Sequence, residues 1–364
     1  MKNDFDKCRL EERNNRIIDA VIAKAERVCP GSLAMIGIYG SFMTGDIHEK
    51  SDLDLLILVN DDAGFQLSSG FIQDDLGVGH DIYCTTWQNL EESIQYDYPQ
   101  ISKLMDSKIV WCADETYRER LNSLRKSVRE QLESPSYANA LARAEEHLRQ
   151  AEHNFAESLT ASSLSAARVC AAHMIWHIQG TLAALNRTYF RLGTRRAYEE
   201  LSAMEKRPEP LCDLIGAVVS ADTEECLHNA LIHLLRETKT TVKTASREFH
   251  TVPKQPVTPE TIGGTYEEMF SNWRNKMYFA AETGDHYLAF MSMSAMSGML
   301  SSLCAAYDTA GSYDAMSGYD PDNLWKTAEF FDRTMDAYLA EYRKAGLDVK
   351  RYADIDEFVK EYLK

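Results

Sequence analysis

Two short apolar runs joined by a polar loop constrain the fold of this chain more than any other feature. The first run, residues 33–39, ends in Gly40-Ser41, and the second, residues 53–59, contains Asp54 and follows Asp52. Runs of this length, bounded by glycine and polar residues, are typical of buried strands. Because side chains two apart on a strand point to the same face, Asp52 and Asp54 are expected to project together, beside the Gly-Ser turn.

A pair of neighbouring carboxylates next to such a turn indicates a specific kind of chemistry. The two charges repel each other unless a cation lies between them, and magnesium prefers oxygen ligands that it usually shares with substrate phosphates. Gly40 allows the backbone to approach a phosphate closely. Ser41 adds a hydroxyl and an amide at the start of a short helix, where anions are favoured. The pattern therefore predicts metal-assisted transfer from a nucleoside triphosphate, with two metal ions bridging the reacting phosphorus.

The arrangement Gly40-Ser41-x10-Asp52-x-Asp54, with Gly45-Asp46 between its parts and Ser51 before the acidic pair, resembles the signature of the nucleotidyltransferase superfamily related to DNA polymerase β. It is most similar to small bacterial members. The helical region that follows resembles that of aminoglycoside and lincosamide nucleotidyltransferases. The first resemblance covers about residues 10–132 and implies that Asp52 and Asp54 are catalytic metal ligands and that Gly40 and Ser41 bind the nucleotide. It also implies ATP or another nucleoside triphosphate as a substrate and Mg²⁺ as the cofactor.

The family's third carboxylate matches Asp81, which follows Asp54 by 27 residues and is the third implied catalytic residue and metal ligand. The chain departs from the family pattern in two places. His80 stands where an apolar neighbour of that carboxylate is usual. The loop after Ser41 reads Phe42-Met43-Thr44-Gly45 and lacks the arginine of many small members, so the phosphate contact of that side chain is expected to be missing.

The charge of the chain bears on its partners. The net charge is −17. Residues 1–134 contain 15 Lys/Arg and 24 Asp/Glu, and residues 135–364 contain 24 Lys/Arg and 32 Asp/Glu. Because Lys and Arg supply most of the affinity for nucleic acids, this composition disfavours a polynucleotide substrate. The same field would attract a cationic small-molecule acceptor. The eight cysteines contain no Cys-x-x-Cys pair and the N-terminus is polar, which together indicate free thiols and a cytoplasmic location.

The periodicity of the chain predicts an α/β (α+β) N-terminal domain with a small mixed sheet, residues 1–134, followed by an all-α region. Further strands are expected at 81–85 and 109–112, and helices at 10–28, 88–96 and 118–131. Beyond Pro135 the strand patterns end, and apolar residues recur every three or four positions. A helical bundle is expected over 135–250, with helices at 137–159, 164–185, 213–219 and 225–247, the second of them apolar nearly all round.

Three prolines within 251–259 predict a linker. A second helical segment, 260–364, is expected to pack on the bundle or extend it, with helices at 266–283, 287–307, 321–345 and 355–363. The segment 287–307 has no charged residue, but its serines make it a poor bilayer span, so no membrane association is expected.

Two smaller patterns have competing interpretations. Arg195-Arg196 is a basic pair that could reach a bound triphosphate, but a solvated pair is the favoured interpretation. His173 and His177 share a helix face at the i, i+4 spacing of zinc ligands, yet no acid lies between them, so two partly buried histidines are expected.

Three functions remain open. The first is transfer of a nucleoside monophosphate, with AMP from ATP favoured, to a hydroxyl of a small molecule such as an aminoglycoside-like antibiotic. The second is the same chemistry on a protein hydroxyl, as in AMPylating, antitoxin-type nucleotidyltransferases. The third is a non-catalytic nucleotide-binding module. Homodimer formation is also open, and fold alone does not choose among these functions.

Overall fold

The computed structural model describes residues 7–96, 101–134, 136–249 and 253–363. The chain divides into two compact units, Met1–His250 and Thr251–Lys364. The first unit carries the sheet and a helical bundle, and the second is helical. The segments expected at 1–134 and 135–250 both lie in the first unit, and the boundary between them stays a prediction.

The first unit is built on a four-stranded mixed sheet in the order β5-β2-β1-β6. β1 pairs antiparallel with β2 and with β6, whereas β2 and β5 are parallel. β3 and β4 form a separate antiparallel hairpin. The small mixed sheet predicted for this part of the chain is therefore confirmed. The strands are β1 (Leu33–Ile38), β2 (Leu55–Val59), β3 (Ser69–Gln73), β4 (Val78–Ile82), β5 (Cys84–Thr86) and β6 (Lys108–Cys112).

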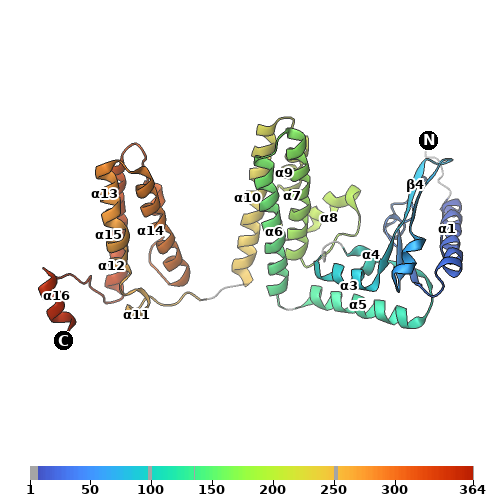
Figure 1. Cartoon of the computed structure of the whole chain (residues 1–364), viewed down its shortest axis with the longest axis horizontal. Coiled ribbons are helices and arrows are strands. Elements are labelled where there is room, and N and C mark those ends of the chain that lie inside the picture. Colours follow the sequence, from blue (N-terminus) through green and yellow to red (C-terminus); the bar gives the residue numbers. More distant parts are fainter. Residues whose placement is uncertain (1–6, 97–100, 135, 250–252, 364) are drawn as a thin grey trace. The chain divides into compact units, whose positions relative to one another are not determined.

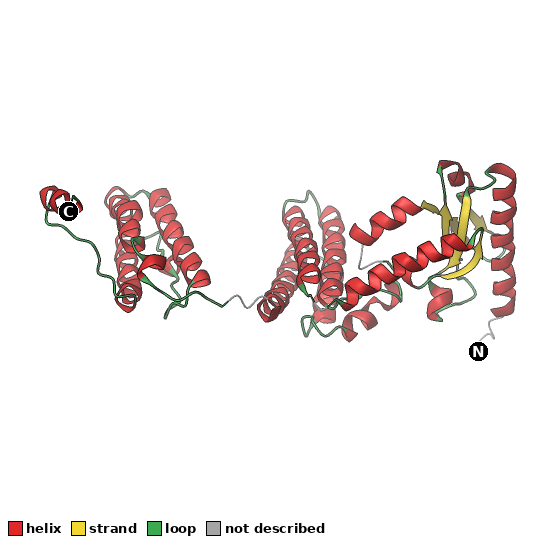
Figure 2. Cartoon of the chain, turned by 90° about the horizontal axis from the view of Figure 1, so that it is seen from below, coloured by secondary structure: helices red, strands yellow, loops and turns green. Residues whose placement is uncertain are grey.

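β2 shows why the sheet is buried on both faces. Leu55, Ile57 and Val59 pack into a cluster with α1 (Lys7–Val28). Leu56 and Leu58 point to the opposite face. There they share a core with α3 (Trp87–Tyr96), α4 (Ser102–Met105) and α5 (Glu115–Glu133). Figure 2 shows the yellow strands with α1 along one side.

The same core continues from the sheet into the helical bundle of the first unit. It joins Leu58 of β2 and Leu121 of α5 to Leu182 of α7 and Leu231 of α10. Figure 1 shows α6, α7 and α10 standing side by side. The bundle consists of α6 (Ala138–Leu159), α7 (Leu164–Leu185), α8 (Ala197–Ala203), α9 (Leu211–Ser220) and α10 (Glu224–Phe249), and the short 3-10 helices η1 (Asp62–Leu67) and η3 (Thr194–Arg196) lie in connecting segments of the unit.

Three local expectations differ from the structure. β2 begins at Leu55, so Asp52 and Asp54 precede the strand, although the Tyr39 N–H donates to the Asp54 carbonyl at 3.1 Å and extends the ladder. The strand expected at 81–85 is divided between β4 and β5, which pair with different strands. β3 was not expected, because its side chains are almost all exposed and leave no alternating pattern.

The expectation that α7 is buried nearly all round is wrong for the part of the helix before Gly180. Gly180 to Leu185 are all buried, but Val169 is 56% exposed and Trp176 is 44% exposed. The bundle covers only one side of the helix over its first turns. Trp176, together with Gln179, lines a cleft.

The second unit is a bundle around Phe331, Met335 and Tyr338 of α15. α14 is long and apolar enough to cross a membrane by length and composition. Met293 and Met296 on this helix are fully buried in the core, whereas Tyr287 and Phe290 are 75% and 45% exposed. The elements are α11 (Pro259–Ile262), α12 (Thr265–Met269), the π-helical turn η4 (Phe270–Arg274), α13 (Asn275–Thr283), α14 (His286–Ala306), η5 (Ala315–Gly318), α15 (Leu324–Lys344) and α16 (Ile355–Tyr362).

The proline-rich segment ends as the second unit begins. Pro259 is the first residue of α11, a position where its missing N–H costs nothing. Pro253 and Pro256 lie outside helices, and residues 251–252 fall outside the described residues.

Candidate active site

Gly40 brings the backbone of the Gly-Ser turn directly against Asp54. Its φ of 68° and ψ of −143° lie in a region that is essentially restricted to glycine. A Cβ atom at this position would lie 1.9 Å from Oδ2 of Asp54. The glycine therefore serves two purposes, since it allows the backbone to turn and leaves room for the carboxylate.

Ser41 begins the short helix α2 (Ser41–Thr44), and its backbone N–H donates to the carboxylate of Asp54. Burial raises the pKa of Asp54, the charge of Asp52 raises it further, and the hydrogen bond from Ser41 opposes both effects. The Ser41 Oγ is buried and has no hydrogen-bond partner among the described residues. Such an atom is costly unless a ligand satisfies it.

Asp52 is exposed at the edge of the turn, next to cationic and polar groups of other elements. Arg13 of α1 donates to the carbonyl oxygen of Ser51 at 2.7 Å, which holds its guanidinium near Asp52. Burial lowers the pKa of Arg13, and the charges of Asp52 and Asp75 act in the opposite direction. The pKa of His80 is lowered by burial first and then by Arg13, with Asp52 opposing.

Asp81 is exposed on β4, in the hairpin outside the main sheet. Its carboxylate nevertheless affects the same tyrosine hydroxyl, that of Tyr39, as the carboxylates of Asp52 and Asp54 do. The pKa of Tyr39 is raised by burial and then by the charges of Asp54, Asp52 and Asp81. The three predicted carboxylates thus all lie within electrostatic reach of one hydroxyl.

Two of the three predicted metal ligands, Asp52 and Asp54, have the chemistry to hold magnesium together. Within the part of the chain that the structure describes, no group of three His, Cys, Asp or Glu side chains lies close enough to hold a metal ion. Asp52 and Asp54 are oxygen donors whose mutual repulsion a cation would relieve, and Mg²⁺ commonly takes one or two carboxylates and completes its shell with water and phosphate oxygens. The role of Asp81 as a third ligand stays a prediction.

A cleft of about 430 Å³ opens on the Gly-Ser turn. One wall belongs to the loop after β1 and the other to α7 and the segment that follows it. Trp176 and Gln179 project from the exposed side of α7, so the cleft offers an aromatic surface and an amide. The lining residues are Tyr39, Gly40, Ser41, Thr44, Asp46, His48, Asp54, Ser102, Trp176, Gln179, Phe190, Arg191, Leu192, Gly193, Thr194, Arg195 and Ala197.

Arg195 and Arg196 share Asp46 as an ion-pair partner, a contact that the favoured interpretation of a solvated pair did not include, although the Arg195 side chain is still 68% exposed. Arg195 Nη2 lies 3.1 Å from Asp46 Oδ1, and Arg196 Nη1 lies 2.9 Å from Asp46 Oδ2. These arginines are 149 and 150 positions from Asp46 in the sequence. Because local patterns carry no information on such contacts, nothing in the sequence indicated that Asp46 would bind this pair.

The bundle contains a histidine pair that the sequence patterns missed. The Nδ1 atoms of His147 and His177 lie 3.4 Å apart, so His177 faces another helix, α6, rather than forming a site with His173. Burial and the charge of His177 lower the pKa of His147 to about 4. Gly180 makes this packing feasible, because a Cβ there would lie 2.6 Å from the His147 ring.

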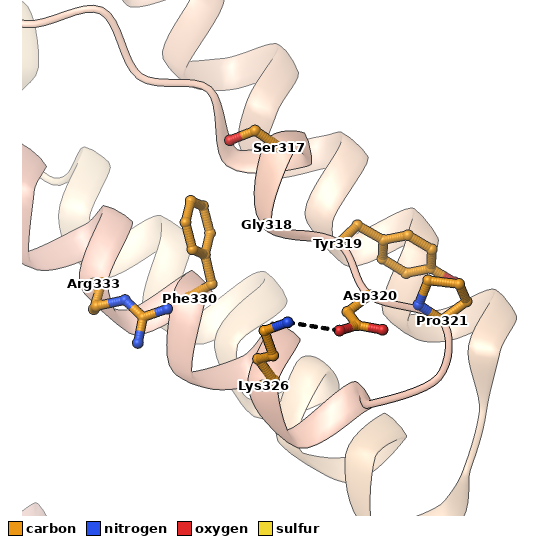
Figure 3. A pocket seen from close by; sticks show the side chains of 8 residues that line it. All are labelled: Ser317, Gly318, Tyr319, Asp320, Pro321, Lys326, Phe330 and Arg333. Atoms are coloured by element: carbon orange, nitrogen blue, oxygen red, sulfur yellow. Dashed lines mark hydrogen bonds and ion pairs between the residues drawn. The ribbon is translucent and has the colours of Figure 1, made fainter.

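The second unit has a cavity of its own, of about 320 Å³, between η5 and α15. Figure 3 shows its lining, including the ion pair of Lys326 with Asp320 at 2.9 Å. It contains none of the residues predicted from the sequence, so the cleft on the Gly-Ser turn remains the candidate active site.

A family model of known proteins covers the segment that contains this site. Residues 22–133 match the family model of the nucleotidyltransferase domain. Among solved structures, the chain is similar to a nucleotidyltransferase-like protein from Exiguobacterium sibiricum 255-15, with 14% sequence identity and a TM-score of 0.32, over 75% of this chain and 92% of that chain. No curated protein matches the chain. The matched segment contains the Gly-Ser turn and all three predicted carboxylates, and residues 22–133 of this chain are a nucleotidyltransferase domain.

Proposed function

We propose that this protein transfers a nucleoside monophosphate from a nucleoside triphosphate, with ATP favoured, to a hydroxyl group in a magnesium-dependent reaction. The observation that carries the proposal is the contact between the Gly-Ser turn and Asp54. The turn leaves space for the carboxylate and donates an amide to it, and Ser41, whose buried hydroxyl has no partner among the described residues, lines the cleft. This is a pre-formed site for an anion and a cation side by side.

Each residue has a distinct part in this reaction. The Ser41 hydroxyl and the backbone at Gly40 would bind phosphate oxygens, because a glycine permits close approach and the hydroxyl has a bond to donate. Asp52 and Asp54 would hold Mg²⁺, which when bound neutralises charge on the phosphates and on the leaving pyrophosphate. Tyr39, whose pKa is raised by burial and by the carboxylates, stays protonated near neutral pH and can donate a hydrogen bond beside them.

The acceptor is proposed to be a small molecule rather than a macromolecule. The cleft has the volume typical of small-ligand sites, and Trp176 offers a flat apolar surface for a ring. An aminoglycoside-like acceptor remains one candidate of this class. A protein hydroxyl is the alternative, and labelled nucleotide supplied with either small acceptors or cell lysate distinguishes the two.

The reaction is tested with Mg²⁺-dependent ATP binding and pyrophosphate release, measured for the wild type and for Asp52→Asn/Asp54→Asn. Loss of both ligands is expected to weaken Mg²⁺-dependent binding and to reduce pyrophosphate release by more than about 100-fold. Glu119→Gln is the control, because Glu119 is exposed on α5 and does not line the cleft. Equal behaviour of the double variant and the wild type would overturn the proposal.

A further inference from the structure

The structure distinguishes two adjacent arginines beside the Gly-Ser turn. We propose that Arg195 is the cation that binds the phosphate chain of the nucleotide in this cleft, and that Asp46 limits its availability by competing with phosphate for the guanidinium. Arg196, in contrast, holds the loop in place. This assignment rests on the proposed function, and it adds a binding residue and a competing counter-ion that the Gly-Ser and Asp-x-Asp motifs do not contain.

The contacts of the two arginines differ in number and in exposure. Arg196 pairs with Asp46 and also with both carboxylate oxygens of Glu199, at 2.6 and 2.7 Å, and its side chain is 28% exposed. It is not among the described residues that line the cleft. Arg195 lines the cleft, its side chain is 68% exposed, and its ion pair among the described residues is the contact of 3.1 Å with Asp46. The Arg196 guanidinium is therefore held by two carboxylates, whereas the more exposed Arg195 guanidinium is held by one and can change its orientation.

Asp46 can release Arg195 without becoming an unpaired charge. Thr44 Oγ1 donates to Asp46 Oδ2 at 2.9 Å, and Arg196 remains bound to the same carboxylate. The hydrogen bond from Arg196 is the main reason that the pKa of Asp46 lies below its usual range, and Thr44 is the second. Departure of Arg195 thus leaves a hydrogen-bonded, ion-paired carboxylate. This keeps the exchange inexpensive, since an uncompensated charge at a partly buried position would be costly.

The position of Arg195 explains a departure noted in the sequence. Thr44 occupies the place in the loop where many small nucleotidyltransferases have an arginine. Arg195 reaches the same loop from the segment after α7, so the chain supplies in space the cation that its loop lacks. A guanidinium can donate two parallel hydrogen bonds to a phosphate group. It therefore makes more charge-assisted hydrogen bonds with a polyphosphate than with a single carboxylate oxygen. A phosphate chain can therefore take Arg195 from Asp46.

The test is calorimetric titration of the full chain with inorganic tripolyphosphate, which has no base or sugar. Arg195→Gln is expected to weaken binding about tenfold, because one charge-assisted interaction is lost. Asp46→Asn is expected to strengthen binding about two- to fivefold at low salt, because phosphate then no longer has to break the ion pair between Asp46 and Arg195, and exposed ion pairs are about that strong. The gain should shrink as salt increases. Asp46→Asn/Arg195→Gln should bind like Arg195→Gln, because Asp46 acts through Arg195.

Arg196→Gln is the matched control at the neighbouring position. It is expected to lower the melting temperature and to change tripolyphosphate affinity less than twofold. Weaker binding by Asp46→Asn, unchanged binding by Arg195→Gln, or equal losses for the two arginine variants would each overturn the assignment. If the wild type binds no tripolyphosphate, or if Ser41→Ala binds it as tightly as the wild type, the proposed function fails as well. If the wild type binds and Ser41→Ala weakens binding while the arginine variants do not, only the assignment of Arg195 fails.

Discussion

Replacing Gly40 with alanine tests the central contact of the site. The residue has φ 68° and ψ −143°, a conformation that costs a non-glycine residue about 1–3 kcal/mol. The new Cβ would also lie 1.9 Å from the Asp54 carboxylate, which must move away from the Ser41 amide. One methyl group should thus both strain the turn and displace a predicted metal ligand.

The expected magnitudes follow from these two effects. In a unit of 250 residues, each kcal/mol lowers the melting temperature by about 2–4 °C, so Gly40→Ala should lower the transition of the first unit by about 2–12 °C in scanning calorimetry. Mg²⁺-dependent ATP binding should weaken at least about tenfold, because a shift of a ligand or of its hydrogen-bonding partner typically costs that much metal affinity.

Gly45→Ala is the matched control. Gly45 also has a positive φ, of 79°, but a Cβ atom added there would meet no other atom within 4 Å, so the substitution adds backbone strain without a clash. We expect a loss of about 1–2 kcal/mol and unchanged ATP binding. If the two variants lose equal stability and bind ATP equally well, the close contact between Gly40 and Asp54 does not organise the site.

Three further predictions concern single carboxylates and a histidine. Burial and the charge of Asp52 raise the folded-state pKa of Asp54, so the contribution of this carboxyl group to stability is present at low pH and is lost as the pH rises through that pKa. Asp54→Asn should therefore raise the melting temperature at pH 7 while it removes pyrophosphate release. A lower melting temperature for this variant would contradict the expectation. The pKa of His147 is lowered from 6.5 to about 4, so up to about 3 kcal/mol of stability should be lost as the pH falls between those values. Urea titrations at pH 7 and pH 4.5 should show a smaller loss for His147→Gln, and equal losses would refute the buried neutral state. Glu341 is fully buried and accepts a backbone N–H at 2.7 Å and a tyrosine hydroxyl at 3.1 Å. Glu341→Gln should cost the second unit less than about 1 kcal/mol, and Glu341→Met about 2–4 kcal/mol, in thermal unfolding; equal costs would show that these bonds contribute little.

The sequence predicted the parts of the fold that local periodicity determines. β2 alternates between the two cores at every residue, and α7 was predicted with its observed bounds, because a strand buried on both faces and a long apolar helix each leave a clear pattern. The β3–β4 hairpin was missed because the side chains of β3 are almost all exposed, and an exposed ribbon has no hydrophobic period.

The candidate site was predicted only as far as its contiguous motifs extend. Gly40, Ser41 and Asp54 meet because a turn and the next strand are neighbours in sequence and in space. The contact of Asp46 with Arg195 and the exposure of Trp176 to the cleft depend on how the bundle packs against the sheet. Such contacts join segments more than a hundred residues apart, and no pattern within either segment encodes the distance between them.

Because the sheet and the bundle of the first unit share one hydrophobic core, they are expected to evolve together rather than as exchangeable parts. Leu58 and Leu121 belong to the same packed interior as Leu182 and Leu231, so exchanging the bundle for another would require the sheet face to be redesigned with it. Shuffling of whole segments is therefore a difficult route to a new ligand preference in this lineage. Divergence is expected instead through single substitutions at cleft positions that carry little of the core, such as Trp176 and Gln179, where a side chain can change without disturbing the interior.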